Sequence, residues 1–431
     1  MDLLAHLQHL ATFNAGDPPA AGDTTAAVTR VVFTEPDLAA RAWLVGLCED
    51  AGLAVRVDAV GNTFARWCPD GCDADAPAVA TGSHCDAIPH SGMYDGTVGV
   101  LGGLAAIRQL QADGFTPARP VELIGFTSEE PTRFGLGCTG SRVMAGLLDD
   151  ADLDRLRDQW GDRGELAERG AIGRRTFNDV RRDAGFTGAA AEAHLPAGHY
   201  DAFVELHTEQ GPLLEAAGVD IGAVTAIAAP AAFELSLIGA SGHAGAQLMP
   251  DRRDALAGAA EAVIDIERTV LAANADRPSP DLVGTVGKLH VHPGNTNAVP
   301  GRVDFTLDLR DTDLAHRDAA EATIRQGLAD LAHRRGLELV IDRVNADPPA
   351  PCADRIVAAV TSAAESAGLT ALRMISRAYH DSTFMSRICP IGMIFIPCRA
   401  GVSHRPDEFA SEAALRNGVD VLARTLRALS S

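Results

Sequence analysis

Histidines and acidic residues follow several apolar runs of this sequence, and their types suit a divalent metal ion. The clusters are His84 with Asp86, Glu129 with Glu130, His207 with Glu209, and His404 alone. Imidazole nitrogen with carboxylate oxygen is a ligand set for zinc, manganese or cobalt. Asp86 has the right type to accept the second imidazole N–H of His84. Where two acids are adjacent, one can bind metal while the other takes a proton from a metal-bound water.

Each cluster has an ordinary explanation when it is taken alone. A histidine and an aspartate one residue apart usually lie at the surface or cap a helix, and Asp95 in "YDG" is a typical turn residue before Gly96. Acids before Pro131 suit the first turn of a helix. His207 could be a hydrogen-bonded histidine at the end of a strand. Four such clusters together favour a shared metal site.

The elements that position these clusters alternate between strands and helices. Four segments have the apolar pattern of strands, namely residues 53–67, 76–86, 120–130 and 201–211. Residues 96–114 have helical spacing, and this pattern ends at a glycine. This alternation is typical of an α/β domain. Such sheets gather ligands beyond the carboxyl ends of their strands. The clusters are therefore expected to converge at one edge of the sheet.

A second pattern follows Pro212. From about residue 232 to 345 the order is strand, helix, strand, strand, helix, strand, which is a self-contained βαββαβ module. After it the α/β pattern returns. We therefore expect an α/β fold with a doubly wound, mixed-sheet catalytic domain formed by residues 1–221 and 346–431, and an inserted domain at 222–345.

Composition excludes several classes of partner. The net charge of −21 over 431 residues would repel nucleic acid and anionic membrane surfaces. A basic and apolar leader and a membrane-length apolar run are both missing, so the expected compartment is the cytoplasm. The eight cysteines are scattered, and the only close pair is Cys68 with Cys72. Because no second pair has matching spacing, a structural zinc is not expected there.

Six motifs, in order along nearly the whole chain, resemble the hydantoinase/carbamoylase branch of the M20 metallopeptidase-like amidohydrolases. They are "GSHCDAIPHSGMYDG", "TSEEPTRFGLGCTGSR", "ELHTEQGP", "SGHAGAQLMPDRRDA", "NTNAVPG" and "GVSHRPDE". The resemblance implies two divalent ions per subunit, most often manganese, with zinc or cobalt as alternatives. The implied roles are Asp95 bridging both ions, His84 and His207 on one ion, Glu130 and His404 on the other, and Glu129 as general base.

The resemblance also assigns the inserted module as a lid and dimerisation domain, which implies a homodimer. His243 in "GHAG" would act across the dimer on the developing oxyanion. Gln210, Asn297 and Arg310 match substrate-binding positions. A guanidinium suits a substrate carboxylate, although Arg310 could equally form an ordinary ion pair with Asp308 or Asp311.

Within this branch, "DAIPHSG", "FTSEEPTRFG" and "RAYHDS" are similar to the ureidoglycolate amidohydrolases. That similarity implies hydrolysis of a ureido C–N bond in the small molecule ureidoglycolate. It also suggests that Tyr379 and His380 contact the substrate while Asp381 orients a neighbour. The alternatives are an N-carbamoyl-L-amino-acid or allantoate amidohydrolase, and a metal-bound protein without catalysis. Glu129 weighs against the last, because a binding protein needs no base.

Overall fold

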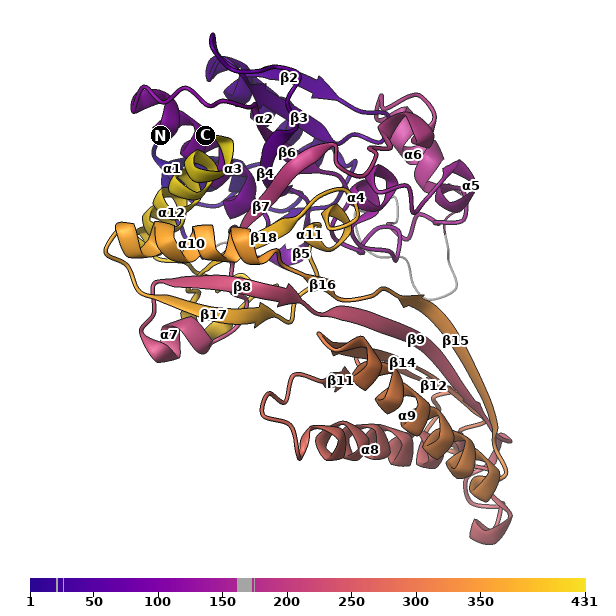
Figure 1. Ribbon diagram of the computed structural model, residues 1–431. Coiled ribbons are helices and arrows are strands. Elements are labelled where there is room, and N and C mark those ends of the chain that lie inside the picture. The colour runs from indigo at the N-terminus through magenta and orange to yellow at the C-terminus, as the bar shows by residue number, and fades with distance from the viewer. Residues whose placement is uncertain (21, 26, 161–172, 174) are drawn as a thin grey trace. The chain divides into compact units, whose positions relative to one another are not determined.

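The chain forms two compact units. The computed structural model describes residues 1–20, 22–25, 27–160, 173 and 175–431. Unit 1 comprises Met1–Thr225, Pro351–Met374 and His380–Ser431, and unit 2 comprises Ala226–Ala350 with Ile375–Tyr379. Unit 2 is thus inserted into the chain of unit 1. Figure 1 shows that both units are layered from sheet and helix, so the expected α/β class with an inserted domain is confirmed.

Unit 1 is built on a nine-stranded mixed sheet. Its four central strands, β18, β7, β4 and β6, are parallel, whereas the pairs β6–β3, β3–β2 and β18–β8 are antiparallel. The order across the sheet is β16 (Ala350–Pro351), β8 (Ile221–Ile227), β18 (Ile391–Ile396), β7 (Tyr200–Thr208), β4 (Ala78–His84), β6 (Val121–Phe126), β3 (Thr63–Trp67) and β2 (Ala54–Val57), with β17 (Ala371–Ser376) beside β8.

Burial explains why the central strands read as apolar runs. Every residue of β4, β6 and β18 is buried, as is typical of parallel strands covered on both faces. The strand register pairs His84 with Phe126 across β4 and β6, and Ile396 with Thr208 across β18 and β7. The carboxyl ends of these strands therefore lie level along one edge of the sheet.

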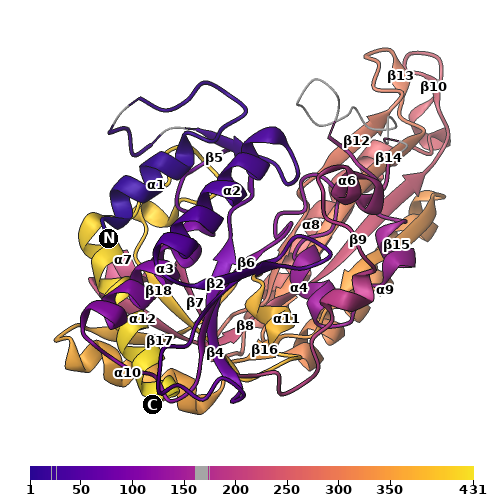
Figure 2. The same cartoon turned by 90° about the horizontal axis from the view of Figure 1, so that it is seen from above.

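Helices cover both faces of this sheet (Figure 2). The helices α3 (Thr97–Ala112) and α12 (Glu412–Ser430) pack together on one face, and α4 (Thr139–Met144) and α11 (Ser382–Met385) lie on the other. α12 is capped at its N-terminus by Ser411, whose side chain accepts the Ala414 N–H. Its buried residues recur every three to four positions, as a helix that lies on a sheet requires.

The single strand expected over residues 53–67 is in fact a hairpin of β2 and β3. The chain turns at Asp58, whose Oδ1 accepts the backbone N–H groups of Val60 and Asn62. An aspartate that bonds to the backbone two residues ahead is a frequent turn device.

Unit 2 is an antiparallel sheet with two helices packed against it. β14 alternates buried and partly exposed residues, and its buried face shares a core with the helices. The first of the two consecutive strands expected between the helices of this module is divided into two, and both parts pair with β14. The elements are β9 (Ala229–Ile238), α8 (Ala255–Asn274), β11 (Val283–Thr285), β12 (Leu289–His292), β14 (Arg302–Asp311), α9 (Leu314–Arg335) and β15 (Glu338–Ala346).

Cys68 and Cys72 form a disulfide that closes the turn after β3, and the other six cysteines are buried and free. The close pair is thus joined by a covalent bond rather than by a structural zinc. Among the described residues, the helices are too short or too polar to cross a membrane.

Candidate active site

The expected metal ligands meet at the carboxyl edge of the central sheet of unit 1. His84 ends β4 and His207 lies near the end of β7, Glu130 follows β6, and His404 follows β18. Asp95 lies in the segment between β5 (Ala87–Ser91) and α3. These residues form two groups in which the ligand atoms all lie within 4.8 Å of one another. The groups are His84 with Asp95 and His207, and Asp95 with Glu130 and His404.

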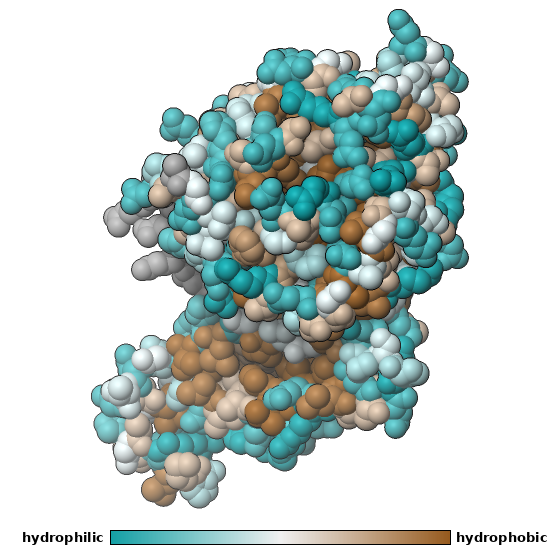
Figure 3. Space-filling model, turned by 90° about the vertical axis from the view of Figure 1, so that its left-hand side faces the viewer, coloured by the Kyte–Doolittle hydropathy of each residue, from teal (hydrophilic) through white to brown (hydrophobic). Residues whose placement is uncertain are grey.

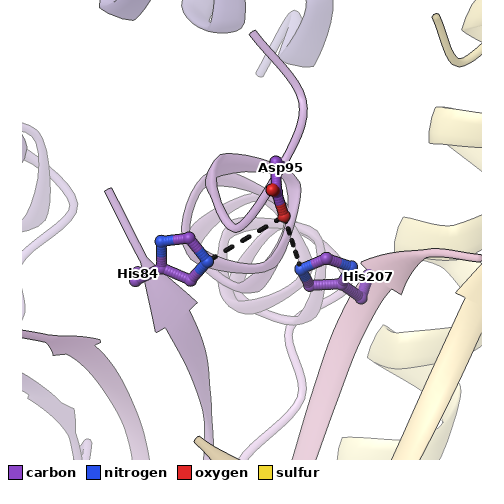
Figure 4. A group of neighbouring side chains, drawn as sticks. All are labelled: His84, Asp95 and His207. Carbon is purple, nitrogen blue, oxygen red and sulfur yellow. Dashed lines mark ion pairs between the residues drawn. The ribbon is translucent and has the colours of Figure 1, made fainter. Parts of the chain in front are cut away.

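In the first group the Asp95 carboxylate lies between two imidazoles (Figure 4). Oδ1 of Asp95 is 3.2 Å from Nε2 of His207 and 4.0 Å from Nε2 of His84. Each imidazole donates its Nδ1–H to a main-chain carbonyl at 2.9 Å, His84 to Asp86 and His207 to Thr208. These hydrogen bonds hold both Nδ1 atoms and place each Nε2, the nitrogen that such a histidine would present to a metal ion, on the side of Asp95.

In the second group the other Asp95 oxygen faces His404. Oδ2 of Asp95 is 3.0 Å from Nε2 of His404, which is 3.5 Å from Oε1 of Glu130. Asp95 thus contributes one oxygen to each group. This is the arrangement in which a carboxylate bridges two ions.

The donor set fits two divalent cations. Burial, with Asp95 close by, raises the pKa of Glu130 to about 8, and Oε1 of Glu130 is a buried atom with no hydrogen-bond partner among the described residues. Burial also lowers the pKa of His84 to about 4, so this imidazole is neutral and can coordinate. The hydrogen bond to Asp95 raises the pKa of His404 to about 9. A divalent ion would supply the positive charge that these crowded acids lack.

Glu129 lies beside the ligands with its carboxylate pointing into the same space. Oε2 of Glu129 is 3.6 Å from Nε2 of His84. Burial, reinforced by the neighbouring charge of Glu130, raises the pKa of Glu129 well above its usual range. A largely buried carboxylate with a raised pKa, adjacent to candidate metal ligands, has the properties of a proton acceptor.

Asp86 holds the loop of the two glutamates. Its carboxylate accepts the backbone N–H of Glu129 at 3.3 Å and of Glu130 at 3.1 Å. The imidazole of His84 is bonded to the Asp86 carbonyl, and the Asp86 carboxylate oxygen is farther from Nδ1, at 3.7 Å. The side chain expected to orient a histidine therefore mainly supports the loop after β6.

Two further residues of the sequence motifs lie behind the ligands. Asp381 is fully buried and accepts a hydrogen bond of 2.5 Å from the Ser141 hydroxyl. His380 is only 2% exposed, and its ring packs edge-on against His207 with the ring centroids 4.6 Å apart. This buried position suits support of His207 better than the substrate contact expected of His380.

Gln210 lies next to the bridging aspartate. Its Nε2 donates to Oδ1 of Asp95 at 3.1 Å and to the Ser403 hydroxyl at 2.9 Å. Its backbone is left-handed, as it also is at Ser128 and His404 in the neighbouring loops. Residues other than glycine rarely adopt this conformation, and they cluster at functional sites.

The remaining candidates belong to unit 2. His243 and Asn297 are brought together because β10 (Gly242–His243) pairs with β13 (Ala298–Val299). Arg310 forms a two-point ion pair with Asp308, with distances of 2.7 and 3.0 Å. The Tyr379 hydroxyl donates to the Asp347 carboxylate at 2.5 Å. Arg310 thus has the ion pair that the sequence allowed, and Tyr379 is anchored within unit 2.

Sequence reasoning missed Glu408. This residue is fully buried, and its Oε2 accepts the backbone N–H of Asp95 at 3.2 Å and of Tyr94 at 3.3 Å. It fixes the loop that presents the bridging carboxylate. The available signal was the motif "SHRPDE", which places an acid four residues after His404.

Gly96 is required beside His84. Its φ is +65°, and a Cβ there would lie 2.4 Å from Nε2 of His84. We expect Gly96→Ala to displace the imidazole and to reduce bound metal by at least about tenfold, as disturbed metal shells usually do. Metal analysis after dialysis checks this. Gly114→Ala is the matched control, because Gly114 has a φ of +68° beyond the other end of α3 with nothing within 4 Å. Equal metal loss in both variants would show that strain of the left-handed backbone, and not contact with His84, causes the loss.

Known proteins are similar to this chain in sequence and in fold. Residues 80–428 match the family model described as peptidase family M20/M25/M40. The chain is 45% identical to a ureidoglycolate hydrolase of Oryza sativa subsp. japonica, over 99% of this chain and 84% of the relative. It is 37% identical to an N-carbamoyl-L-amino-acid amidohydrolase of Paenarthrobacter aurescens, over 98% and 96% of the two chains.

Solved structures of similar proteins match the fold of this chain over nearly its whole length. The crystal structure of AtUAH in complex with (S)-hydroxyglycine superposes with a TM-score of 0.86 at 44% identity, over 99% of this chain and 97% of that chain. A second crystal structure holds AtUAH in complex with glyoxylate, with the same score and coverage.

Proposed function

The chain belongs to the peptidase family M20/M25/M40, and we propose that it is an amidohydrolase that converts (S)-ureidoglycolate to glyoxylate, ammonia and carbon dioxide. The observation that carries this proposal is the convergence of five side chains that can bind metal, together with Glu129, at one sheet edge. The relative in rice that carries the name ureidoglycolate hydrolase aligns over nearly the whole chain. The bound (S)-hydroxyglycine and glyoxylate of AtUAH are the products expected from this substrate.

In this proposal His84 and His207 hold one divalent ion, Glu130 and His404 hold the other, and Asp95 binds both. Manganese is the ion we favour, with zinc or cobalt as alternatives. When bound, the two ions would polarise the ureido carbonyl and lower the pKa of water.

The reaction then depends on proton transfer by Glu129. Its Oε2, which faces Nε2 of His84, takes the proton of the attacking water. His243 stabilises the negative charge that develops on the carbonyl oxygen. Glu129 returns its proton to the leaving nitrogen, which departs as ammonia. Loss of carbon dioxide leaves hydroxyglycine, which decays to glyoxylate and a second ammonia.

Substrate binding is assigned to Gln210 in unit 1 and to Asn297, Arg310 and Tyr379 in unit 2. The ion pair with Asp308 fixes the plane of the Arg310 guanidinium, which suits recognition of a planar carboxylate. Because these groups belong to both units, we propose that unit 2 acts as a lid that closes on the substrate.

We also propose a homodimer through unit 2. Its sheet ends in the short strands β11 and β12, which pair only with β14 among the described strands. α8 exposes Leu256, Ile264 and Leu271, and Leu289 of β12 is also exposed. Figure 3 shows apolar surface gathered on unit 2. An open sheet edge beside an apolar helix face suits pairing with a second copy.

The main alternative is hydrolysis of N-carbamoyl-L-amino acids or allantoate on the same metal site. The amidohydrolase of Paenarthrobacter aurescens, at 37% identity, keeps this alternative open. A larger substrate would need space near Tyr379. A metal-bound protein without catalysis is disfavoured, because Glu129 would have no purpose in it.

Mixing two inactive variants tests whether His243 acts in the active site of the partner subunit. We expect wild-type protein to release ammonia from ureidoglycolate, and His243→Ala and Glu129→Gln each to fail alone. If His243 acts on the partner's site, one of the two sites in each mixed dimer is intact, so a mixed dimer should have about half of wild-type activity. Because random exchange makes about half of the dimers mixed, the whole mixture should recover up to about a quarter of wild-type activity. Ammonia release from the mixture after subunit exchange is the measurement. A mixture as inactive as its components would place His243 in its own subunit's site.

A further inference from the structure

A buried cysteine lies next to the proposed base. Cys138 is fully buried, and its Sγ is 3.4 Å from Oε1 of Glu129. The other oxygen of that carboxylate, Oε2, faces Nε2 of the metal ligand His84. The two oxygens of Glu129 therefore have different partners, one on the side of the thiol and one on the side of the ion site.

Backbone hydrogen bonds fix the position of Cys138 relative to Glu129. The segment that carries Cys138 runs beside the loop of the base, joined by three successive hydrogen bonds. They run from the N–H of Cys138 to the Glu129 carbonyl at 2.7 Å, from Thr139 to Ser128 at 2.9 Å, and from Gly140 to Thr127 at 2.8 Å. A side chain at position 138 is therefore held at a fixed distance from the carboxylate.

The conformation of Cys138 is unusual for its residue type. Its φ and ψ are 56° and 34°, the left-handed region that a glycine adopts without strain. Cysteine has no polar oxygen that favours this region, as aspartate and asparagine have. Strained residues persist where the surrounding structure holds them in place, and they cluster at active sites. Here the backbone hydrogen bonds hold Cys138, and its strained conformation places the thiol against Glu129.

We propose that Cys138 is a positioning residue whose S–H donates a hydrogen bond to Oε1 of Glu129 and keeps Oε2 turned toward the ion site. This inference rests on the proposed role of Glu129 as the base. The torsion that turns a carboxylate is broad, so a donor on one oxygen selects among its orientations. Burial, with the charge of Glu129, raises the pKa of the Cys138 thiol well above its usual range, so the thiol retains the proton it donates.

Three substitutions separate this role from a merely structural one. Cys138→Gly removes the thiol and relieves the left-handed strain, Cys138→Ala removes the thiol alone, and Cys138→Ser keeps a donor. We expect kcat for ureidoglycolate to fall about 10- to 100-fold in the glycine and alanine variants, with KM and bound metal unchanged. The serine variant should stay within about threefold of wild type, because a hydroxyl also donates. The midpoint of thermal unfolding of Cys138→Gly should not fall.

The control is Cys389→Ala, which removes a buried free thiol near Asp201 at the start of β7, the end of that strand remote from His207. Its kcat should not change. A crystal structure of Cys138→Ala should show the Glu129 carboxylate in more than one orientation.

Turnover within twofold of wild type in both the glycine and alanine variants would overturn the proposal, as would loss of bound metal in proportion to activity. Glu129→Gln distinguishes this failure from that of the proposed function. If that variant is inactive while Cys138 proves dispensable, the base is retained and only the role of Cys138 is lost. If Glu129→Gln is fully active, the proposed function itself fails.

Discussion

Replacing Glu129 by glutamine should lower kcat for ureidoglycolate by about 10³-fold or more and leave both metal ions bound. An amide of the same shape cannot accept the proton of the attacking water, and positioned proton transfer contributes roughly 10²- to 10⁴-fold. Metal binding should persist because the proposed ligands are other residues, and His84, whose Nε2 lies 3.6 Å from Oε2 of Glu129, keeps its hydrogen bond to Asp86. Steady-state ammonia release and metal analysis of the same sample provide the two measurements.

Glu130→Gln is the matched control for this prediction. It makes the same chemical change one residue away, at a carboxylate whose Oε1 lies 3.5 Å from Nε2 of His404. There we expect loss of metal together with loss of turnover, because an amide oxygen is a weaker ligand than a carboxylate. Turnover of Glu129→Gln within tenfold of wild type would remove Glu129 from the mechanism.

Replacing Asp95 by asparagine should weaken binding of both ions by at least about 100-fold and abolish turnover. Asp95 is the residue common to both ligand groups, with one oxygen 3.2 Å from His207 and the other 3.0 Å from His404. A neutral amide presents only one oxygen, so it cannot bind both ions. It also lacks the negative charge that offsets the positive charge of the two ions. Disturbing even the partners of metal ligands costs roughly 10- to 100-fold, and loss of a shared ligand should cost more.

Titration of metal-free Asp95→Asn with manganese, followed by calorimetry, checks this prediction. Gln210→Ala is the control, since it removes a hydrogen bond to the same carboxylate but leaves the carboxylate itself in place. That variant should keep two ions and change mainly KM. If Asp95→Asn still binds two ions with wild-type affinity, Asp95 does not bridge them.

The sequence could predict the site because its geometry follows from buried parallel strands. Apolar runs such as β4 and β6 are recognisable as strands, and their carboxyl ends share one edge, so His84 and the Glu129–Glu130 pair had to approach one another. The βαββαβ order of unit 2 was likewise readable from periodicity. These features depend on local sequence and on general rules of packing.

The features that were missed depend on contacts between distant segments. Glu408 resembles a solvated loop acid in the sequence, yet it is buried and holds the Asp95 loop from more than 300 residues away. His380 lies in a polar motif but is buried behind His207. β-branched and aromatic residues continue on both sides of Asp58, so the segment resembled a single strand. The chain in fact turns at Asp58 and forms a hairpin. Neither burial nor long-range pairing can be read from residue type alone.

The most direct test of the account is the relative kcat/KM of the manganese-loaded enzyme for (S)-ureidoglycolate, allantoate and a set of N-carbamoyl-L-amino acids, measured as ammonia released under identical conditions. The proposed function predicts a clear preference for (S)-ureidoglycolate, with glyoxylate among the products. A preference for allantoate or for an N-carbamoyl-L-amino acid would contradict the assigned substrate, and no ammonia from any of them, with two ions bound, would contradict hydrolysis of ureido bonds altogether.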